Sequence, residues 1–340
     1  MTAPKRIVSG QSLEEDSRVE ATVRPQRLSE FIGQDRLKEN LSIAVEAARS
    51  RGDALDHVLV YGPPGLGKTT LAQILANEMG ANIRISSGPL LERKGDLTAL
   101  LTALEARDFL FLDEIHRLLP ALEEILYPAM EDFRVDLMIG QGPGARLHNM
   151  SLQRFTLVGA TTRAGLLMAP LRSRFGIVHR LDFYTPEEML QIIRRSAGIL
   201  GISADEAGAQ EIARRSRGTP RVGNRLLRRV RDFAEVRAGG SVTLSVAQDA
   251  LAMLGVDEQG LDDMDRKLML MLIEKYGGGP AGLGTLAASL SEEEDVIEEV
   301  YEPYLMQIGL LSRTPRGRVA TASAYKYFGV TEPKRQAHLF

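Results

Sequence analysis

The sequence contains no cysteine and no tryptophan, and each absence excludes a class of protein. Without a thiol the chain has no disulfide scaffold, no zinc site built on thiolates and no cysteine nucleophile. With no tryptophan and only 5% aromatic residues, a site that stacks on sugars or cages a methylated cation is disfavoured. Catalytic chemistry in this chain must therefore rest on other side chains.

Long apolar runs are missing as well. No stretch approaches the roughly 18 apolar residues of a membrane-spanning helix. The first thirty residues mix basic and acidic side chains and lack the apolar core of a secretory signal. We therefore expect a cytoplasmic protein.

The composition is otherwise ordinary for a globular protein, with 340 residues, 44% of them hydrophobic and 26% charged. At about 150 residues per domain, this length predicts two or three domains. The net charge of −3 argues against an anionic partner such as nucleic acid, unless the charge is unevenly distributed along the chain.

A large α/β domain is expected at 21–183, after a polar segment at 1–20 that is expected to be a flexible tail. Short apolar runs alternate there with amphipathic stretches, which predicts a parallel sheet with helices on both faces. The predicted strands cover 57–61, 83–86, 109–112, 155–160 and 177–183, and the predicted helices cover 37–48, 68–79 and 96–106. A β-hairpin with a Gly-Pro-Gly tip is expected at 133–152.

Two smaller domains are expected after position 183. Helix starts marked by capping boxes at 185–188 and 203–206, and by Pro220 at a first helical position, predict an all-helical domain at 184–255. Over 256–330, helices that include one capped by Ser291 precede two short strands flanking residues 314–317, an order typical of a winged helix-turn-helix. Residues 331–340 are expected to form a tail.

Residues 62–69 (GPPGLGKT) match the phosphate-loop pattern G-x-x-x-x-G-K-S/T between a predicted strand and a predicted helix, as the motif requires. Glycines let consecutive backbone N–H groups face the phosphates at a helix N-terminus. Lys68 is expected to neutralise the β- and γ-phosphates of ATP, and the Thr69 hydroxyl to complete the shell of a Mg²⁺ ion.

The apolar run 109–112 ends in Asp113 and Glu114, which predicts the second half of the nucleotide site. Asp113 is expected beside the metal, which it would hold through water. Glu114, one step farther along, can polarise a water molecule towards the γ-phosphate. Two adjacent carboxylates favour a hydrolase over a nucleotide-binding switch.

An ordered set of motifs resembles the AAA+ ATPases and, within them, the RuvB family, the motors of bacterial Holliday-junction branch migration. The AAA+ motifs are DEIH at 113–116, GATTR at 159–163 and LRSRFG at 171–176, and the segments that narrow the resemblance are 24–25, 31–34 and 313–318. The resemblance covers about residues 20–330. It implies an AAA+ P-loop domain followed by a helical lid and a winged-helix DNA-binding domain.

The resemblance implies roles that spacing alone does not give. Thr161 would be the polar sensor near the γ-phosphate, and Arg221, in the first turn of a lid helix, would report nucleotide state. Arg174 would be the arginine finger, which reaches the ATP of a neighbouring subunit in a hexameric ring. Arg172 is the competing candidate for the finger. His116 is expected to have a structural or coupling role.

The resemblance also implies a set of nucleotide contacts. The phosphate contacts are Gly62, Gly65, Leu66, Gly67, Lys68, Thr69 and Thr70. The adenine contacts are Val23, Arg24, Ile32 and Tyr184, although a plain core position is an equal alternative for Tyr184. The residues expected near a nucleotide at the subunit boundary are Glu131, Asp132 and Phe133.

The hairpin at 133–152 is, by the same resemblance, the place where the junction-recognising partner RuvA docks. Its residues Leu137, Met138 and Ile139 are apolar and adjoin the predicted tip. Exposed apolar residues on a protruding hairpin favour a protein contact. The alternative is a hairpin packed on its own domain.

Charge is strongly segregated along the chain. Nine arginines against three acids give 211–240 a local +6, thirteen acids against three basic residues give 257–302 a local −10, and six basic residues against one acid give 311–340 a local +5. The acidic helix expected at 292–302 would be repelled by phosphates. We therefore predict that Arg313, Arg316 and Arg318 contact the DNA backbone without sequence specificity, whereas the arginine-rich helix at 211–240 could serve subunit contacts.

The expected function is an ATP-driven DNA motor that works in recombination, repair and the SOS response to DNA damage. Mg-ATP hydrolysis between ring subunits would drive branch migration, with RuvA and a resolvase nuclease as partners. Two rivals remain open: an ATP-gated DNA-loading factor and a protein-remodelling ATPase. Sustained hydrolysis stimulated by duplex DNA would separate the motor from both.

Overall fold

The computed structural model describes residues 7–9, 21–139 and 146–332. The described residues form two compact units. One is Arg24–Phe183, and the other consists of the described residues from Tyr184 onward and of the N-terminal segment that ends at Val23. Among the helices formed by these residues, none is long and apolar enough to cross a membrane.

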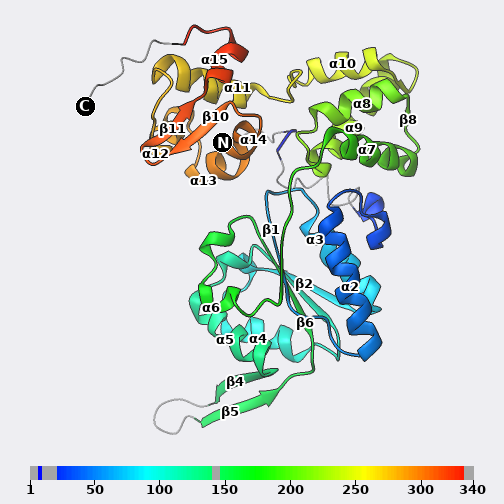
Figure 1. Cartoon of the computed structure of the whole chain (residues 1–340), viewed down its shortest axis with the longest axis vertical. Coiled ribbons are helices and arrows are strands. Elements are labelled where there is room, and N and C mark those ends of the chain that lie inside the picture. Colours follow the sequence, from blue (N-terminus) through cyan, green and yellow to red (C-terminus); the bar gives the residue numbers. More distant parts are fainter. Residues whose placement is uncertain (1–6, 10–20, 140–145, 333–340) are drawn as a thin grey trace. The chain divides into compact units, whose positions relative to one another are not determined.

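The unit Arg24–Phe183 is built on a parallel five-stranded sheet in the order β2-β3-β6-β1-β7. Its strands are β1 (Val58–Tyr61), β2 (Ile83–Ser87), β3 (Phe109–Asp113), β6 (Thr156–Thr161) and β7 (Ile177–Arg180). The central strands β3 and β6 are almost entirely buried, as strands covered on both faces are. Figure 1 shows α2 and α3 on one face and α4 and α5 on the other, so the predicted α/β fold is confirmed.

The helices of this unit largely follow the predicted pattern. They are α2 (Asp35–Arg51), α3 (Lys68–Met79), α4 (Lys94–Thr102), α5 (Pro120–Glu131) and α6 (Ala169–Arg172), with 3₁₀ turns η1 (Leu28–Glu30), η2 (Gly88–Leu90), η3 (Ile115–Arg117) and η5 (Ala164–Leu166). Helix α3 has the predicted bounds, whereas α4 ends at Thr102, before the predicted end at 106. Helix α5 was not predicted at all. Its residues Leu122 and Leu126 pack in the core with Leu97 and Phe155.

The β-hairpin expected at 133–152 consists of β4 (Arg134–Ile139) and β5 (Arg146–Ser151), which pair antiparallel and form a sheet of their own. It follows α5 directly and lies at the edge of the unit (Figure 1). The side chains of Leu137, Met138 and Ile139 and the tip at 140–145 lie outside the part that the structure describes. The predicted RuvA contact therefore stays a prediction.

The lid is helical, as predicted. It contains α7 (Pro186–Leu200), α8 (Glu206–Arg215), α9 (Pro220–Arg237) and α10 (Leu244–Met253), with the two-residue strands β8 (Ser203–Ala204) and β9 (Ser241–Val242). Thr185 caps α7 in the predicted capping box with Glu188. The predicted cap of α8 was wrong: Asp205 caps this helix, because Ser203 is drawn into β8 by pairing with β9.

Residues 7–9 lie within the expected flexible tail, but they pack on the lid. Val8 and Ser9 are buried. Arg225 of α9, itself buried, donates hydrogen bonds to the carbonyl oxygens of Ile7 at 2.9 Å and Ser9 at 2.8 Å. These three residues are thus anchored because a buried guanidinium needs acceptors.

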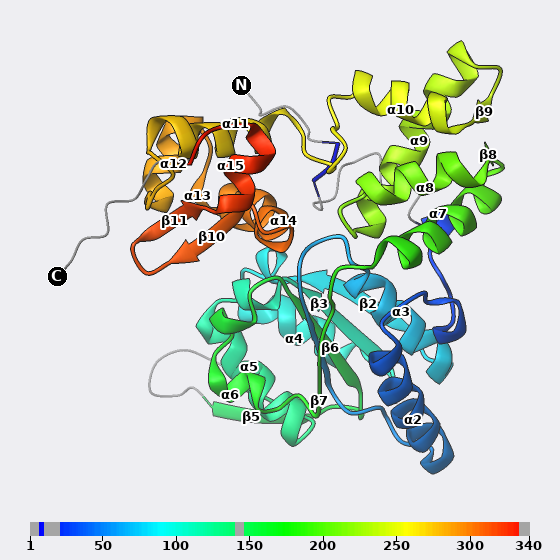
Figure 2. The same ribbon diagram turned by 45° about the horizontal axis from the view of Figure 1, so that its top comes forward.

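The last domain contains a two-stranded wing between its helices. Its elements are α11 (Asp263–Leu270), η6 (Met271–Lys275), α12 (Leu283–Leu290), α13 (Glu294–Val296), η7 (Ile297–Tyr301), α14 (Glu302–Gln307), β10 (Leu311–Thr314), β11 (Gly317–Ala320) and α15 (Ala322–Phe328). Figure 2 shows β10 and β11 as a hairpin beside these helices. The predicted cap at Ser291 was wrong: Ser291 ends α12 in the left-handed conformation, with φ of 57°, and Glu293 precedes the next helix.

Candidate functional site

The loop 62–69 joins β1 to α3 and has the backbone of a phosphate cradle. Gly62, Gly65 and Gly67 have φ values of 144°, 81° and 103°, which only glycine adopts readily. A Cβ atom on Gly62 would lie 2.4 Å from the carbonyl oxygen of Leu181. The loop leads directly into the N-terminus of α3, where backbone N–H groups favour an anion.

Lys68 lies inside this loop rather than in solvent. Its side chain is buried, with the residue 7% exposed, and its Nζ donates to the carbonyl oxygens of Gly62 at 2.7 Å and Pro63 at 3.0 Å. A buried ammonium needs such acceptors. The positive charge is thereby held at the place where the loop would receive phosphate oxygens.

The segment expected to contact adenine is divided between the two units. Within Arg24–Phe183, half-buried Ile32 follows Phe31, whose ring would lie 3.4 Å from a Cβ placed on Gly67. Arg24 reaches Gln73 of α3 at 3.3 Å. The 31–32 segment therefore borders the phosphate loop.

Val23 and Tyr184 belong to the unit that contains the lid, and both are buried there. The N–H of Tyr184 donates to the carbonyl oxygen of Gly218 at 2.9 Å, and burial raises the pKa of its phenol. Tyr184 is thus held in a buried position beside Gly218, and the predicted adenine contact stays a prediction. Arg221 is half-buried in the first turn of α9.

Asp113 and Glu114 lie at the end of β3, as predicted. The carboxylate of Asp113 accepts the N–H of Glu114 at 3.0 Å. Glu114 has φ of 44° and ψ of 48°, a left-handed conformation that is uncommon outside glycine. Gly88 makes this turn possible, because a Cβ at Gly88 would lie 2.5 Å from the carbonyl oxygen of Glu114.

The Glu114 carboxylate is held by two neighbours. Its Oε2 accepts the N–H and the hydroxyl of Thr162, both at 3.2 Å, and lies 3.3 Å from Nδ1 of His116. Burial disfavours the carboxylate, but the hydrogen bonds from His116 and Thr162 and the charge of Lys68 outweigh it, so the pKa of Glu114 lies below its ordinary value. Glu114 is therefore ionised at neutral pH.

Thr161 shares His116 with Glu114. It is fully buried at the end of β6, opposite Tyr61 of β1, and its hydroxyl lies 2.8 Å from Nδ1 of His116. The structure thus brings Glu114, His116 and Thr161 together at the carboxyl ends of β3 and β6. Sequence reasoning missed Thr162, although its place in the polar run that follows β6 was an available signal.

The guanidinium of Arg174 contacts residues of α5 and α6. Nη2 pairs with Glu131 at 2.9 Å, Nη1 donates to the carbonyl oxygen of Pro170 at 2.6 Å, and the group lies 4.7 Å from the centre of the Tyr127 ring. Arg172 is exposed. Of the two finger candidates, Arg174 is the one that the structure joins to Glu131, a residue expected at the subunit boundary.

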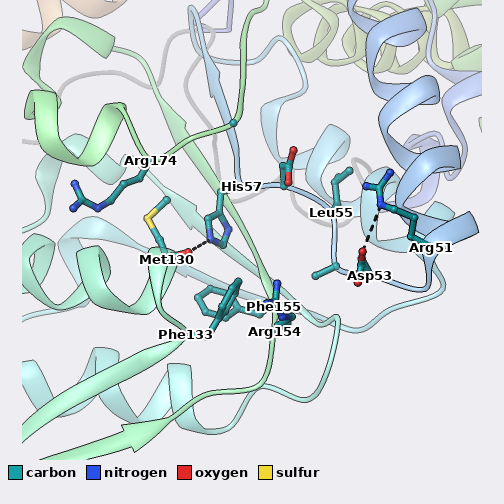
Figure 3. Close-up of a pocket in the computed structure, with 12 residues that line it drawn as sticks. Arg51, Asp53, Leu55, His57, Met130, Phe133, Arg154, Phe155 and Arg174 are labelled. Atoms are coloured by element: carbon teal, nitrogen blue, oxygen red, sulfur yellow. Dashed lines mark hydrogen bonds and ion pairs between the residues drawn. The ribbon is translucent and has the colours of Figure 1, made fainter.

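A pocket of about 400 Å³ adjoins Arg174 and Phe133. His57 forms one wall: its Nε2 lies 3.1 Å from the carbonyl oxygen of Met130, and its Nδ1 accepts the N–H of Leu157 at 2.9 Å. Burial lowers the pKa of His57, so the ring is neutral with its proton on Nε2. Figure 3 shows this ring beside Met130 while the Arg174 side chain points away from it. His57 thereby ties the start of β1 to the end of α5.

The three arginines expected to contact DNA differ in their surroundings. Arg316 is exposed at the turn between β10 and β11. Arg313 and Arg318 lie opposite each other in the two strands and are paired with the carboxylates of Glu298 and Glu302. The predicted contact of all three arginines with the DNA backbone stays a prediction, and the structure adds that Arg313 and Arg318 are paired with carboxylates whereas Arg316 is exposed.

Comparison with known proteins gives three matches to family models. They are the Holliday junction DNA helicase RuvB P-loop domain over 23–181, the RuvB AAA lid domain over 184–257 and the RuvB C-terminal winged helix domain over 258–329.

Individual relatives resemble the chain over almost its whole length. The Holliday junction branch migration complex subunit RuvB of Koribacter versatilis is 63% identical over 336 residues, covering 99% of this chain and 93% of that protein. The structure of the Thermotoga maritima RuvB Holliday junction branch migration motor is 51% identical, with a TM-score of 0.85 over 92% of this chain and 100% of that chain.

Proposed function

The chain belongs to the RuvB family, and from that premise we propose that its phosphate loop, Glu114, Arg174 and wing together drive branch migration of Holliday junctions. It is an AAA+ ATPase and a branch-migration motor. The observation that supports this proposal most directly is that Glu114, His116 and Thr161 lie together at the carboxyl ends of β3 and β6. Strand β6 pairs with β1, the strand that leads into the phosphate loop.

ATP would be held first through its phosphates. The proposed phosphate contacts are the backbone N–H groups of Gly62, Gly65, Leu66, Gly67, Lys68, Thr69 and Thr70 and the ammonium of Lys68. The Lys68 ammonium already donates hydrogen bonds to carbonyl oxygens of the loop. When a phosphate binds, the ammonium would exchange these acceptors for phosphate oxygens, and its charge is already in position. Adenine would be contacted by Val23, Arg24, Ile32 and Tyr184, and Arg221 would sense the nucleotide from the lid.

A Mg²⁺ ion would be held by Thr69 and, through water, by Asp113. A hydroxyl and a carboxylate suit this cation, which takes its remaining places from phosphate oxygens and water. When bound, the ion offsets the charge of the β- and γ-phosphates.

Hydrolysis would require Glu114 to leave Thr162 and to orient a water molecule towards the γ-phosphate. Its low pKa keeps it ionised for that role. Arg174 would serve the nucleotide of the next subunit in a hexameric ring, with Glu131, Asp132 and Phe133 at the same boundary. Thr161 would register the γ-phosphate through the His116 bond.

Junction DNA and a partner complex follow from the family, and we assign them to two places. The wing arginines Arg313, Arg316 and Arg318 would grip the duplex backbone, and the hairpin β4–β5 would dock RuvA.

The test of function is ATP-dependent branch migration of a synthetic four-way junction with homologous arms, followed by gel electrophoresis. We expect conversion of the junction to duplex products, faster when RuvA is added, and no conversion by Lys68→Ala. Sustained duplex-stimulated ATP hydrolysis with no junction conversion at any RuvA concentration would contradict the proposal.

A further inference from the structure

Glu302 is a fully buried carboxylate in the winged-helix domain, and both of its oxygens face arginines of the wing. Oε1 accepts a hydrogen bond from Nε of Arg318 at 2.6 Å. Oε2 accepts hydrogen bonds from Nη2 of Arg313 and, at 3.3 Å, from Nη2 of Arg318. Four residues earlier, Glu298 lies 3.0 Å from Nη1 of Arg313. One buried carboxylate therefore bridges two guanidinium groups.

The bridging carboxylate offsets the repulsion between two positive charges in the wing. Arg313 and Arg318 are opposite each other in β10 and β11, so their side chains share one face of the hairpin, where like charges repel. The side chain of Arg313 remains 41% exposed and that of Arg318 12% exposed. A guanidinium has five N–H donors, so the donors not turned to a carboxylate remain for another anion.

We propose that Glu302 is a positioning residue for DNA: it fixes the two guanidinium groups so that their remaining donors meet backbone phosphates. This inference rests on the proposed DNA contact of the wing and adds the group that orients it. Arg316, exposed at the turn, needs no such support. A guanidinium that is already fixed by a buried hydrogen-bonding partner loses less side-chain entropy when it binds a phosphate.

The proposal predicts an effect opposite in sign to simple electrostatics. Removing a negative charge close to DNA should strengthen binding to a polyanion. Removing the carboxylate that orients two arginines should weaken binding, because both side chains become mobile and repel each other. The sign of the change therefore distinguishes a positioning role from a bystander charge.

The experiment measures binding of a short duplex to the full chain by fluorescence anisotropy, with Mg²⁺ and a slowly hydrolysed ATP analogue, over a series of salt concentrations. For Glu302→Gln we expect affinity to fall by roughly three- to tenfold. The slope of log K against log salt should flatten by about one unit for each phosphate that the wing no longer binds. Glu293→Gln is the matched control, because Glu293 is exposed in the same acidic stretch and its replacement should leave affinity unchanged or raise it.

If circular dichroism shows that Glu302→Gln unfolds the domain, Glu298→Gln serves as the second test variant. Glu298 is partly exposed, so its replacement should be tolerated, and affinity should fall in the same direction but less. If Glu302→Gln or, where that variant unfolds, Glu298→Gln binds DNA as tightly as wild type or more tightly, the positioning role is overturned.

The double variant Arg313→Ala with Arg318→Ala separates this failure from that of the proposed DNA contact. Unchanged affinity in the double variant would overturn the wing contact itself. Lower affinity, with no further decrease when Glu302→Gln is added, is the result expected if Glu302 acts through these two arginines.

Discussion

Single residues in the candidate site depend on backbone conformations that most side chains avoid. Glu114 has a left-handed backbone and Gly88 leaves room for its carbonyl oxygen. A non-glycine residue in that region costs on the order of 1 kcal/mol, and such residues cluster at functional sites. The conformation turns the carboxylate towards Thr162 and His116, away from the line of β3.

Sequence motifs could predict Asp113 and Glu114 because the pattern that marks them is local. The partners of Glu114 could not be predicted in the same way, because Thr162 is brought near by the pairing of β3 with β6, where Leu112 lies opposite Gly159. Contacts made across a sheet depend on strand order, which one sequence does not contain as a local signal.

Replacing Glu114 by Gln should separate nucleotide binding from hydrolysis. The amide keeps an oxygen that can accept from Thr162 but cannot act as a base, so we expect kcat to fall by at least about 100-fold with ATP affinity nearly unchanged. Lys68→Ala should instead lose ATP binding, because the loop loses its only charge. A fluorescent ATP analogue and a phosphate-release assay measure the two quantities. A Glu114→Gln protein with near-normal kcat would remove Glu114 from the mechanism.

At the scale of helices and strands, local signals succeeded where tertiary contacts agreed with them. Thr185 and Pro220 start their helices as predicted. The predicted cap at Ser203 was wrong because β8 pairs with β9, which lies almost forty residues away in the sequence. Helix α5 was missed because Pro128 lies in its interior, where proline removes a hydrogen-bond donor and normally signals a helix end.

Helix α11 is joined to the lid by a buried ion pair. Arg217, between α8 and α9, pairs with the fully buried Asp265, donates Nε to the carbonyl oxygen of Gly260 at 2.7 Å, and lies 4.9 Å from the centre of the Tyr304 ring. Breaking a buried pair leaves an uncompensated charge, which costs about 3–5 kcal/mol. The pair therefore couples the stability of the lid to that of the winged-helix domain.

Asp265→Asn should lower the calorimetric melting transition of these domains by at least about 5 °C. The matched control is Asp263→Asn on the same helix, whose 88%-exposed side chain pairs with Arg266 and should change stability little. Equal melting of the two variants would show that the Arg217–Asp265 pair contributes no more than a surface pair.

On the scale of the whole molecule, the net charge of a stretch of sequence does not show how many of its charged side chains can reach a partner. The arginine-rich stretch 211–240 has a local +6, but Arg215, Arg217 and Arg225 are buried and bonded within their own unit. In the wing, two of three arginines are paired with acids of the stretch that carries the local −10. Domain order and segregated charge could be predicted from sequence, whereas which arginines remain available depends on tertiary pairing.

Ring assembly gives the sharpest test at this scale, because Arg174 is expected to act on a neighbour's ATP. Within the chain, Arg174 contacts Glu131, Tyr127 and Pro170. Arg174→Ala and Lys68→Ala should each be inactive alone. When they are mixed equally, about a quarter of subunit boundaries, one half times one half, join an intact Lys68 to an intact Arg174, so hydrolysis should recover towards that fraction of wild type.

The control mixture is Lys68→Ala with Glu114→Gln, since both changes damage the site of the chain that carries them and no boundary regains a complete site. Phosphate release at constant total protein, with ring assembly followed by native mass spectrometry, gives the comparison. Recovery in the Arg174→Ala mixture alone identifies a finger that acts in trans. Intact mixed rings without recovery would contradict this assignment, because a boundary that supplies every required side chain from two chains would then be inactive.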